Sequence, residues 1–368
     1  MATEVEMFTI GVEEEFLLVD PESRRLIPQA DRILPPAKEL LGDQVAPELQ
    51  SSQIETGTTI CRTLDDVRNE LVRLRREVSS AAQQEGKVIA ASGTHPFSDW
   101  RSSKITPTEA YQRLERDYQQ LAREQIICGC HVHVGLKNRE EAIDVMNRVH
   151  PWLSPVLALS VNSPFWLGID TGYGSFRSEI WRRWPTAGTA HYFSSRSEYD
   201  ALVQTLLDTG SIDAPARIYW DVRPSAAFST LEFRVTDVCL TVDEAVMVAA
   251  LFRALGRTCH RMVERGEEGV RPRPELIKSA TWRAARYGIE SDLIDLEAGA
   301  SIPARDLVAK MLRFLEPDLV EHGEWTEVRE LVEGVLARGT GSARQRAAFA
   351  KRERMEDVVD YIVTETYP

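Results

Sequence analysis

Apolar and polar residues alternate along several short segments of the chain, and this two-residue period predicts β-strands. In each segment, apolar or aromatic side chains occupy one face and charged or polar side chains occupy the other. The clearest examples are 8–19, 49–56, 126–135 and 230–236. Two shorter strands are expected at 88–92 and 218–223.

A helical period of 3.6 residues appears between the strands and dominates the last third of the chain. Thr106-Pro-Thr-Glu109 forms a capping box with proline at the first helical position, which predicts a helix to about residue 125. Segment 138–160 is expected to be helical, with a break near Pro151 and Pro155. Further helices are expected at 63–85, 241–265, 272–287, 303–315, 324–337 and 342–365.

The order of these elements predicts an α+β fold with an antiparallel sheet. The connection 162–196 is long and rich in tryptophan, and connections of that length in a compact domain are usually functional. Neither an internal repeat nor a low-complexity linker divides the sequence. We therefore expect one domain over 1–368, in which 1–240 is mainly sheet with helices and 241–368 is mainly helical.

Composition excludes several classes of partner. The 368 residues carry a formal net charge of -13, which disfavours nucleic acid and anionic membranes. The longest apolar region, 152–169, is interrupted by Pro155, Asn162 and Pro164, so we expect no membrane span. The start lacks the features of a secretory signal, and the five cysteines show no paired CxxC motif. Reduced thiols in the cytoplasm are the simplest interpretation.

The polar faces of four predicted strands carry side chains suited to metal and phosphate chemistry. Two carboxylates side by side on one strand face repel each other unless a cation or several donors lie between them. If the four strands share one sheet, these side chains line a single concave surface. Carboxylates with an imidazole suit Mg²⁺ or Mn²⁺. The residues concerned are Glu13, Glu15, Glu55, His131, His133, Glu232 and Arg234.

Each of these features also has a purely structural interpretation. Glu55 alone suits a surface acid, and His131 and His133 suit strand histidines with satisfied hydrogen bonds. Glu232 and Arg234 could form a simple charge pair. Repetition of one pattern on separate strands favours a functional site. Because no Walker A motif or dinucleotide fingerprint occurs, a phosphate site would be centred on metal ions.

The chain resembles the type 2 glutamate–cysteine ligase family, which includes the YbdK-like carboxylate–amine ligases. The similar segments occur in order over nearly the whole chain, and the first and fourth of them together are specific. They are Thr9-Ile-Gly-Val-Glu-Glu-Glu-Phe16, Gln53-Ile-Glu55, Ser92-Gly-Thr-His-Pro96, Cys128-Gly-Cys-His-Val-His-Val-Gly135, Trp220-Asp-Val-Arg-Pro-Ser225, Thr230-Leu-Glu-Phe-Arg-Val-Thr-Asp237 and Gly339-Thr-Gly-Ser-Ala-Arg-Gln-Arg346.

The resemblance implies a glutamine-synthetase-like fold, in which a curved antiparallel sheet forms a funnel and helices cover its outer face. It also implies ATP- and Mg²⁺-dependent formation of an amide bond through an acyl phosphate, with Mn²⁺ as an alternative cation. The expected substrates are two: a small carboxylate, which is glutamate, and an amine. A homodimer is the default expectation from symmetry statistics.

The resemblance also implies roles for individual residues. The expected metal ligands are Glu13, Glu15, Glu55, His131 and Glu232. Arg234, with Glu232, is expected to act in catalysis by stabilising the transferred phosphoryl group. The expected nucleotide contacts are His133, Arg344 and Arg346, and the expected substrate contacts are Arg177 and Arg223.

Two other functions stay open at this point. His131 and His133 could bind zinc in a metal-dependent hydrolase, although several strand glutamates favour a harder cation. Alternatively, the chain could be a non-catalytic member of the fold. The amine also stays open, because the sequence gives no direct indication of an amine pocket.

Overall fold

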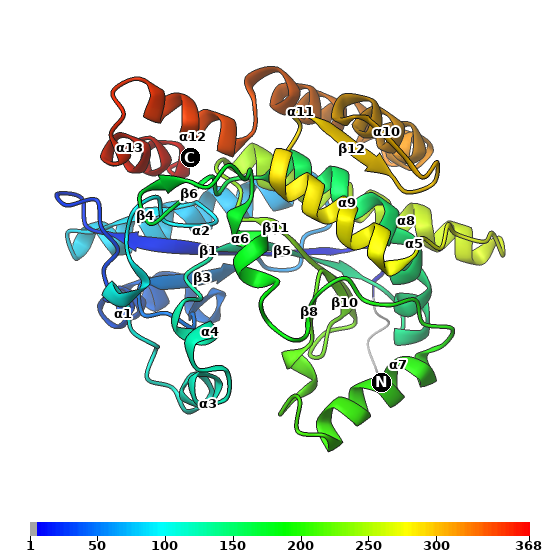
Figure 1. Cartoon of the computed structure of the whole chain (residues 1–368), viewed down its shortest axis with the longest axis horizontal. Helices are drawn as coiled ribbons and strands as arrows, with labels where there is room; N and C mark the ends of the chain where they lie inside the picture. Colours follow the sequence, from blue (N-terminus) through cyan, green and yellow to red (C-terminus); the bar gives the residue numbers. More distant parts are fainter. Residues whose placement is uncertain (1–5) are drawn as a thin grey trace.

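The computed structural model describes residues 6–368. The argument about a secretory signal concerns residues 1–5, which lie outside the described part. The described chain is built on one central sheet. Figure 1 shows strand β1 nearly edge-on, with most helices of the C-terminal third on one side of it and the segment from α6 to β10 on the other. Within this part of the chain, no helix is both long enough and apolar enough to cross a membrane.

The sheet joins the four strands selected by their polar faces, and every pairing in it is antiparallel. Its order is β10 (Val222–Pro224), β11 (Thr230–Asp237), β5 (Gly129–Gly135), β1 (Ile10–Val19), β3 (Gln53–Gly57) and β2 (Val45–Pro47), with β4 (Val88–Ala90) also on β1. The register places Glu13 opposite His131 and Glu15 opposite Glu55. Since paired residues point to the same face, the polar side chains share one surface.

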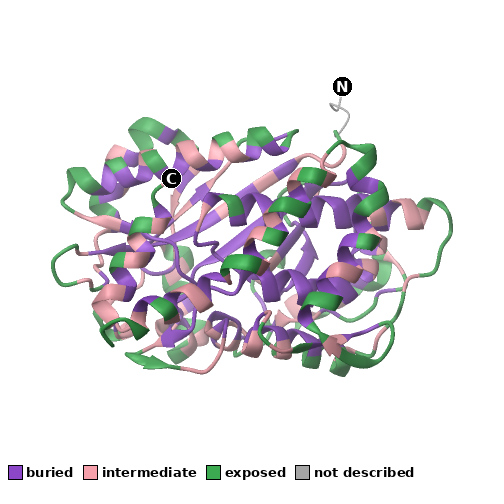
Figure 2. Ribbon diagram, turned by 90° about the horizontal axis from the view of Figure 1, so that it is seen from above, coloured by how far each residue is buried: buried purple, intermediate pink, exposed green. Residues whose placement is uncertain are grey.

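The apolar face of the sheet packs on helices α2 (Leu64–Gln84), α5 (Arg139–Ser160) and α8 (Val242–Glu264). Phe233 stacks on Phe252 of α8 with ring centroids 4.3 Å apart. Gly256 permits this close approach, because a Cβ there would lie 3.1 Å from Val134. Figure 2 shows the buried residues concentrated in the sheet and the central helices.

Glu14 is the one charged residue of β1 that points into this apolar face, and its partner is Arg75 of α2. The two side chains are fully buried and form a two-pronged ion pair at 2.6 and 3.0 Å. Arg75 also donates to the backbone carbonyls of Cys239 and Leu240 at 2.7 and 3.0 Å. The pair therefore fixes β1 to α2 and to the segment that follows β11.

Three helix predictions were wrong in detail. Helix α5 runs without a break through Pro151 and Pro155, because its second half is buried on all sides and packing outweighs the lost hydrogen bonds. The helix expected after Thr106 starts at Glu109, capped by Thr108, and is divided by Gln119 at φ 51°. The last predicted helix is two helices, separated near Glu353 at φ 55°.

The remaining elements include helices α1 and α7, which the periodicity did not indicate. Two prolines lie inside α1 and obscure its helical pattern. The elements are α1 (Ala30–Leu41), α3 (Glu109–Tyr118), α4 (Gln120–Arg123), β6 (Phe165–Trp166), β7 (Ile169–Asp170), α6 (Phe176–Trp181), β8 (Ala187–Gly188), α7 (Arg196–Asp208), β9 (Tyr219–Trp220), α9 (Pro274–Tyr287), β12 (Asp292–Asp295), β13 (Ala300–Pro303), α10 (Ala304–Glu321), α11 (Trp325–Arg338), α12 (Gly341–Ala350) and α13 (Met355–Thr366).

The substitution Glu14→Gln tests the role of the buried pair. It leaves the Arg75 charge buried without a counter-charge, so we expect the free energy of unfolding to fall by about 3–5 kcal/mol in urea titrations. Replacing both residues by apolar ones should recover part of this loss. Arg329→Met, which removes an exposed pair with Glu333, is the control and should cost less than about 1 kcal/mol. Equal losses in the single and double variants would assign the effect to the carbonyl bonds of Arg75.

Candidate active site

The polar face of the sheet brings the predicted metal-binding side chains into two groups. Ligand atoms of Glu13, His133 and Glu232 lie within 4.8 Å of one another. Those of Glu15, Glu48 and Glu55 form a second group with the same spacing. Four of the five expected ligands therefore converge, with three differences: His133 joins the first group, Glu48 joins the second, and His131 belongs to neither.

His131 lies between the two groups and touches both. Its Nδ1 atom is 3.3 Å from Glu13, and its Nε2 atom is 4.0 Å from Glu15. His133 places Nε2 at 3.3 Å from Glu13, while its Nδ1 atom is 2.9 Å from the Thr230 hydroxyl. Glu13 is thus the central carboxylate, shared by both imidazoles.

The second group carries more negative charge than its surroundings balance. Burial raises the pKa of Glu15 to about 8, and repulsion from Glu48 adds to this, although the Gly129 N–H donates to the Glu15 carboxylate at 2.6 Å. Burial and the charges of Glu13, Glu48 and Glu15 likewise raise the pKa of Glu55 well above its ordinary value. These carboxylates lack a cation among the described side chains that would fully balance them.

The first group is ionised more readily. Burial opposes the ionisation of Glu13, but hydrogen bonds from His131 and His133 outweigh it and hold the pKa of Glu13 well below the ordinary value. Burial also opposes the ionisation of Glu232, but the charges of Arg234 and Arg223 outweigh it and hold the pKa of Glu232 below the ordinary value. Burial, reinforced by the charge of Arg234, lowers the pKa of His131 to about 4, so its imidazole is neutral at physiological pH.

This donor set fits a hard divalent cation. Each group offers carboxylate oxygens at mutual distances that one ion can span, and the first adds an imidazole nitrogen of His133. The excess negative charge around Glu15 and Glu55 is what a bound cation would offset. Zinc would ordinarily take more nitrogen or sulfur ligands than either group provides.

Arg223 and Arg234 flank Glu232 and play different parts. Arg223 binds Glu232 through two hydrogen bonds at 2.9 and 3.1 Å and also donates to the carbonyls of Ala216 and Ile218. The Arg223 guanidinium is therefore occupied, and its role is to orient Glu232. Arg223 lines neither of the two cavities described below, so the structure does not support the expected contact with substrate. Arg234 also pairs with Glu232, but its guanidinium lies 5.6 Å from the Trp181 ring and its Nε atom has no partner.

Arg177 reaches the site from the long connection that the sequence singled out. The connection is anchored by Asp237 of β11, which accepts hydrogen bonds from the Asn162 N–H at 2.8 Å and from the hydroxyls of Ser163 and Ser175 at 2.7 and 2.6 Å. Ser175 caps α6, so Arg177 enters the site from the first turn of that helix. Its guanidinium donates to the Arg234 carbonyl at 3.3 Å.

Arg344 and Arg346 do not join this group of residues. Arg344 pairs with Glu244 and Glu365, and Arg346 pairs with Asp170 at 2.7 Å. These contacts fasten α12 to its neighbours. The structure therefore gives no support to their predicted contacts with nucleotide.

Two cavities are lined by residues of the acidic groups. The larger, about 780 Å³, is lined by Glu13, Glu55 and His133 together with Gly11, Gly57 and Phe228. The smaller, about 170 Å³, is lined by Glu15, Glu48, His131, Arg177, Arg234, Trp181, Gln125 and Tyr111, among others. Glu13 and Glu55 thus face the larger cavity, and Glu15 and Glu48 face the smaller one, which also contains arginines; we call these four carboxylates the acidic ridge.

Several residues of the smaller cavity were missed from the sequence. Glu48 follows a short strand and Tyr111 lies in the first turn of a helix, so no periodic pattern selects them. Their hydroxyl and carboxylate are 3.4 Å apart. Gln125 and Trp181 are also absent from the predicted set, although the tryptophan content of the long connection was a usable signal. Both carry a buried N–H group without a partner.

Comparisons with known proteins agree with the predicted resemblance. The sequence model of glutamate–cysteine ligase family 2 matches residues 9–361. A provisionally named glutamate–cysteine ligase 2-2 from Frankia alni is 43% identical, with 97% of each chain covered. A provisionally named glutamate–cysteine ligase 2-3 from the same organism is 42% identical, but this chain spans only 41% of its length.

The solved structures confirm the expected fold. The glutamate–cysteine ligase of Francisella tularensis, crystallised in complex with AMP, superposes with a TM-score of 0.72 at 12% identity. The alignment covers 99% of this chain and 90% of that one. The arrangement predicted from the sequence, an antiparallel sheet with helices on its outer face, is therefore correct.

Cation binding should depend on pH in a defined direction. A carboxyl whose folded pKa is raised to about 8 is largely protonated at about pH 6, and the cation must displace that proton. We expect the affinity for Mg²⁺ to rise between about pH 6 and pH 8, by up to about tenfold per pH unit for each proton displaced. Calorimetry in two buffers of different ionisation enthalpy measures the affinity for Mg²⁺ and the number of protons displaced.

Glu15→Gln is the informative variant for this titration, because it removes one titrating group. It should release fewer protons on Mg²⁺ binding and show a flatter pH dependence. The same raised pKa makes the metal-free protein less stable as pH increases through about 8, so Mg²⁺ should raise the melting temperature more at the higher pH. An affinity that is constant over this range would contradict the electrostatic assignment.

Proposed function

The chain belongs to glutamate–cysteine ligase family 2, and from that membership we propose that it is an ATP-dependent ligase that joins the γ-carboxylate of glutamate to an amine. A ligase of the glutamate–cysteine ligase type follows from the family itself. ATP, Mg²⁺ and the γ-glutamyl product are the proposed part. The observation that carries it is the acidic ridge, whose carboxylates line two cavities of unequal size.

The larger cavity suits a nucleotide. Its volume of about 780 Å³ lies within the range of ordinary ligand pockets. Its lining combines apolar surface from Phe228 and Ile60, which are 64% and 69% exposed, with the carboxylates of Glu13 and Glu55. A nucleotide with its base on this apolar surface would place its phosphates over the acidic ridge. The Francisella tularensis structure is a complex with AMP, which supports a nucleotide as the ligand.

The smaller cavity suits an amino acid with carboxylate groups. Four of its lining residues have buried N–H groups without partners, and such groups are costly unless an acceptor satisfies them. They are Gln125, Arg177, Trp181 and Arg234. A carboxylate in this cavity would accept their hydrogen bonds.

The proposed reaction has two steps. A glutamate carboxylate oxygen attacks the γ-phosphorus of ATP, and ADP leaves to give an acyl phosphate. The amine then attacks the acyl carbon, and phosphate and a proton are released with the amide. Divalent cations held by the two carboxylate groups would reduce the repulsion between the anionic reactants. No protein nucleophile is needed.

The chain's own residues hold the reactants in line. Arg223 donates two hydrogen bonds to Glu232 and so fixes the carboxylate that also pairs with Arg234. The neighbouring carboxylates raise the pKa of Arg234, although burial opposes this, so it stays cationic where phosphoryl charge would develop. Arg177, held through Ser175 and Asp237, orients the carboxylate substrate.

The alternatives are less well supported. A zinc hydrolase based on His131 and His133 is not favoured, because the histidines share Glu13 with a ridge rich in carboxylates. A non-catalytic role does not account for the retained acids. We also propose that the chain acts as one catalytic unit, since helices after residue 241 cover the apolar face of the sheet. Homodimerisation and a cytoplasmic location stay predictions from the sequence.

A screen of ADP release tests the proposed reaction. Purified protein with glutamate, ATP and Mg²⁺ should release ADP only when a suitable amine is added, and the product mass should equal glutamate plus amine minus water. Glu232→Gln should abolish this release, because it weakens both the metal group and the Arg234 pair. ATP-independent hydrolysis of amides, or undiminished turnover in the variant, would contradict the proposal.

Gly57→Val tests the place of the nucleotide. A Cβ at Gly57 would meet no atom within 4 Å, and its register partner is Glu13, so the added side chain projects into the larger cavity beside Glu13. We expect unchanged stability and a KM for ATP raised about tenfold or more, since a steric conflict costs about 1–3 kcal/mol. Gly57→Ala should have a smaller effect. Normal nucleotide affinity in the valine variant would remove the nucleotide from this cavity.

A further inference from the structure

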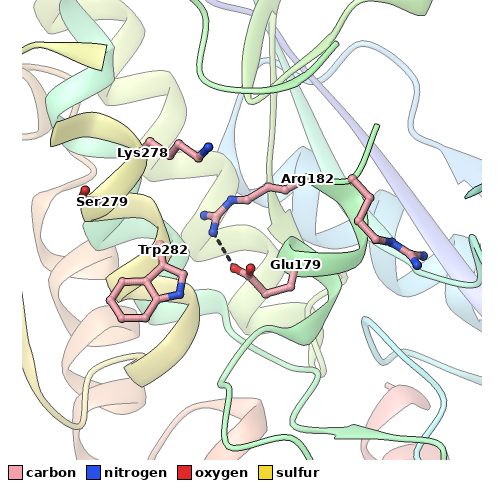
Figure 3. A pocket seen from close by; sticks show the side chains of 6 residues that line it. Glu179, Arg182, Lys278, Ser279 and Trp282 are labelled. Carbon is pink, nitrogen blue, oxygen red and sulfur yellow. Dashed lines mark hydrogen bonds and ion pairs between the residues drawn. The ribbon is translucent and has the colours of Figure 1, made fainter. Parts of the chain in front are cut away.

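A groove outside the catalytic cavities lies between helix α9 and the segment that contains α6. It consists of two adjoining cavities of about 440 and 390 Å³ that share Arg182 and Lys278 in their walls. The first is lined by Glu179, Arg182, Arg183, Lys278, Ser279 and Trp282 (Figure 3). None of the residues proposed for metal, nucleotide or glutamate binding lines either part.

The outward face of α9 supplies one wall of this groove. Its exposed residues recur at positions i, i+3, i+4 and i+7, which places them on one stripe of the helix. They are Glu275, Lys278, Ser279 and Trp282. The opposite stripe, with Ile277, Ala280 and Ala284, is buried and anchors the helix. The wall is therefore held in place by packing on its far side.

Positive charge is in excess where the two walls meet. Figure 3 shows the Lys278 ammonium directed toward the Arg182 guanidinium. Arg182 pairs with Glu179 at 2.5 Å, but within residues 6–368 Lys278 forms no ion pair, and Glu275 is already paired with Arg273. Glu179 balances Arg182, so Lys278 is left as the cation in this wall without a counter-charge. Such a local excess stands out on a chain whose net charge is -13.

Trp282 adds a flat apolar surface to the same place. Its side chain is 39% exposed, which is unusual for so large an aromatic ring. The indole N–H donates to the Tyr173 hydroxyl at 3.2 Å, and the ring meets Tyr287 edge-on at 6.3 Å. The ring is thus fixed in orientation while one side stays open to the groove.

We propose that this groove is a second ligand site, which binds a small organic anion by its carboxylate or phosphate group at Lys278 and Arg182 and by a flat apolar part at Trp282. A cation pair and an aromatic surface are the features that such a ligand requires. The site is separate from the catalytic cavities, and the proposal does not rest on the proposed ligase reaction.

Calorimetric titration of the full chain with benzoate and with phenyl phosphate tests the site. At least one probe should bind with saturation, and the stronger one identifies the anionic group. Lys278→Ala and Trp282→Ala should each weaken binding about tenfold. Lys278 is exposed and forms no ion pair within residues 6–368, so Lys278→Ala should keep the wild-type melting temperature. Lys351→Ala removes an exposed lysine elsewhere and should bind normally.

Three outcomes would overturn the proposal. Neither probe binds with saturation to the wild-type chain, binding survives in both groove variants, or saturating glutamate and ATP with Mg²⁺ displace the probe competitively. The last result would place the probe in the catalytic cavities. Failure of the ligase assay would leave this test unaffected, because binding is measured without turnover.

Discussion

Five carboxylates crowded on and beside one face of a single sheet impose the constraint on which the rest of the structure depends. Glu13, Glu15, Glu48, Glu55 and Glu232 contribute ligand atoms to two compact groups, and their mutual repulsion opposes folding wherever no counter-charge is present. The opposite face of the sheet offsets this cost with a continuous apolar core under three long helices. A site of this kind requires a large domain, because the apolar surface whose burial stabilises the fold must lie outside the functional surface.

Arginines divide the task of balancing these charges. Arg75 neutralises Glu14 on the buried side, where any unpaired carboxylate would be most costly. Arg223 is fully occupied by Glu232 and by two carbonyls, so its contribution is geometric. Arg177 and Arg234 retain unpartnered donors and face the small cavity. Whether an arginine is committed to the fold or available for a ligand is thus visible in its hydrogen bonds.

The sequence predicted the sheet and its polar face because strand alternation determines which residues point together once strands are paired. It could not predict Glu48 or Tyr111, which reach the site from a turn and a helix start where no period operates. It also misplaced Arg223, because a motif position does not reveal whether a guanidinium faces a ligand or a neighbouring carboxylate. The uninterrupted α5 shows the same limit: local proline signals were overruled by burial from every side.

Helix α6 shows how closely the fold joins its two surfaces. It has only six residues, yet Arg177 and Trp181 turn to the small catalytic cavity while Glu179 turns to the outer groove. The helix is held at its start by Ser175 and Asp237, so the position of Arg177 depends on the end of β11. One short helix therefore supplies side chains to the small cavity and to the outer groove.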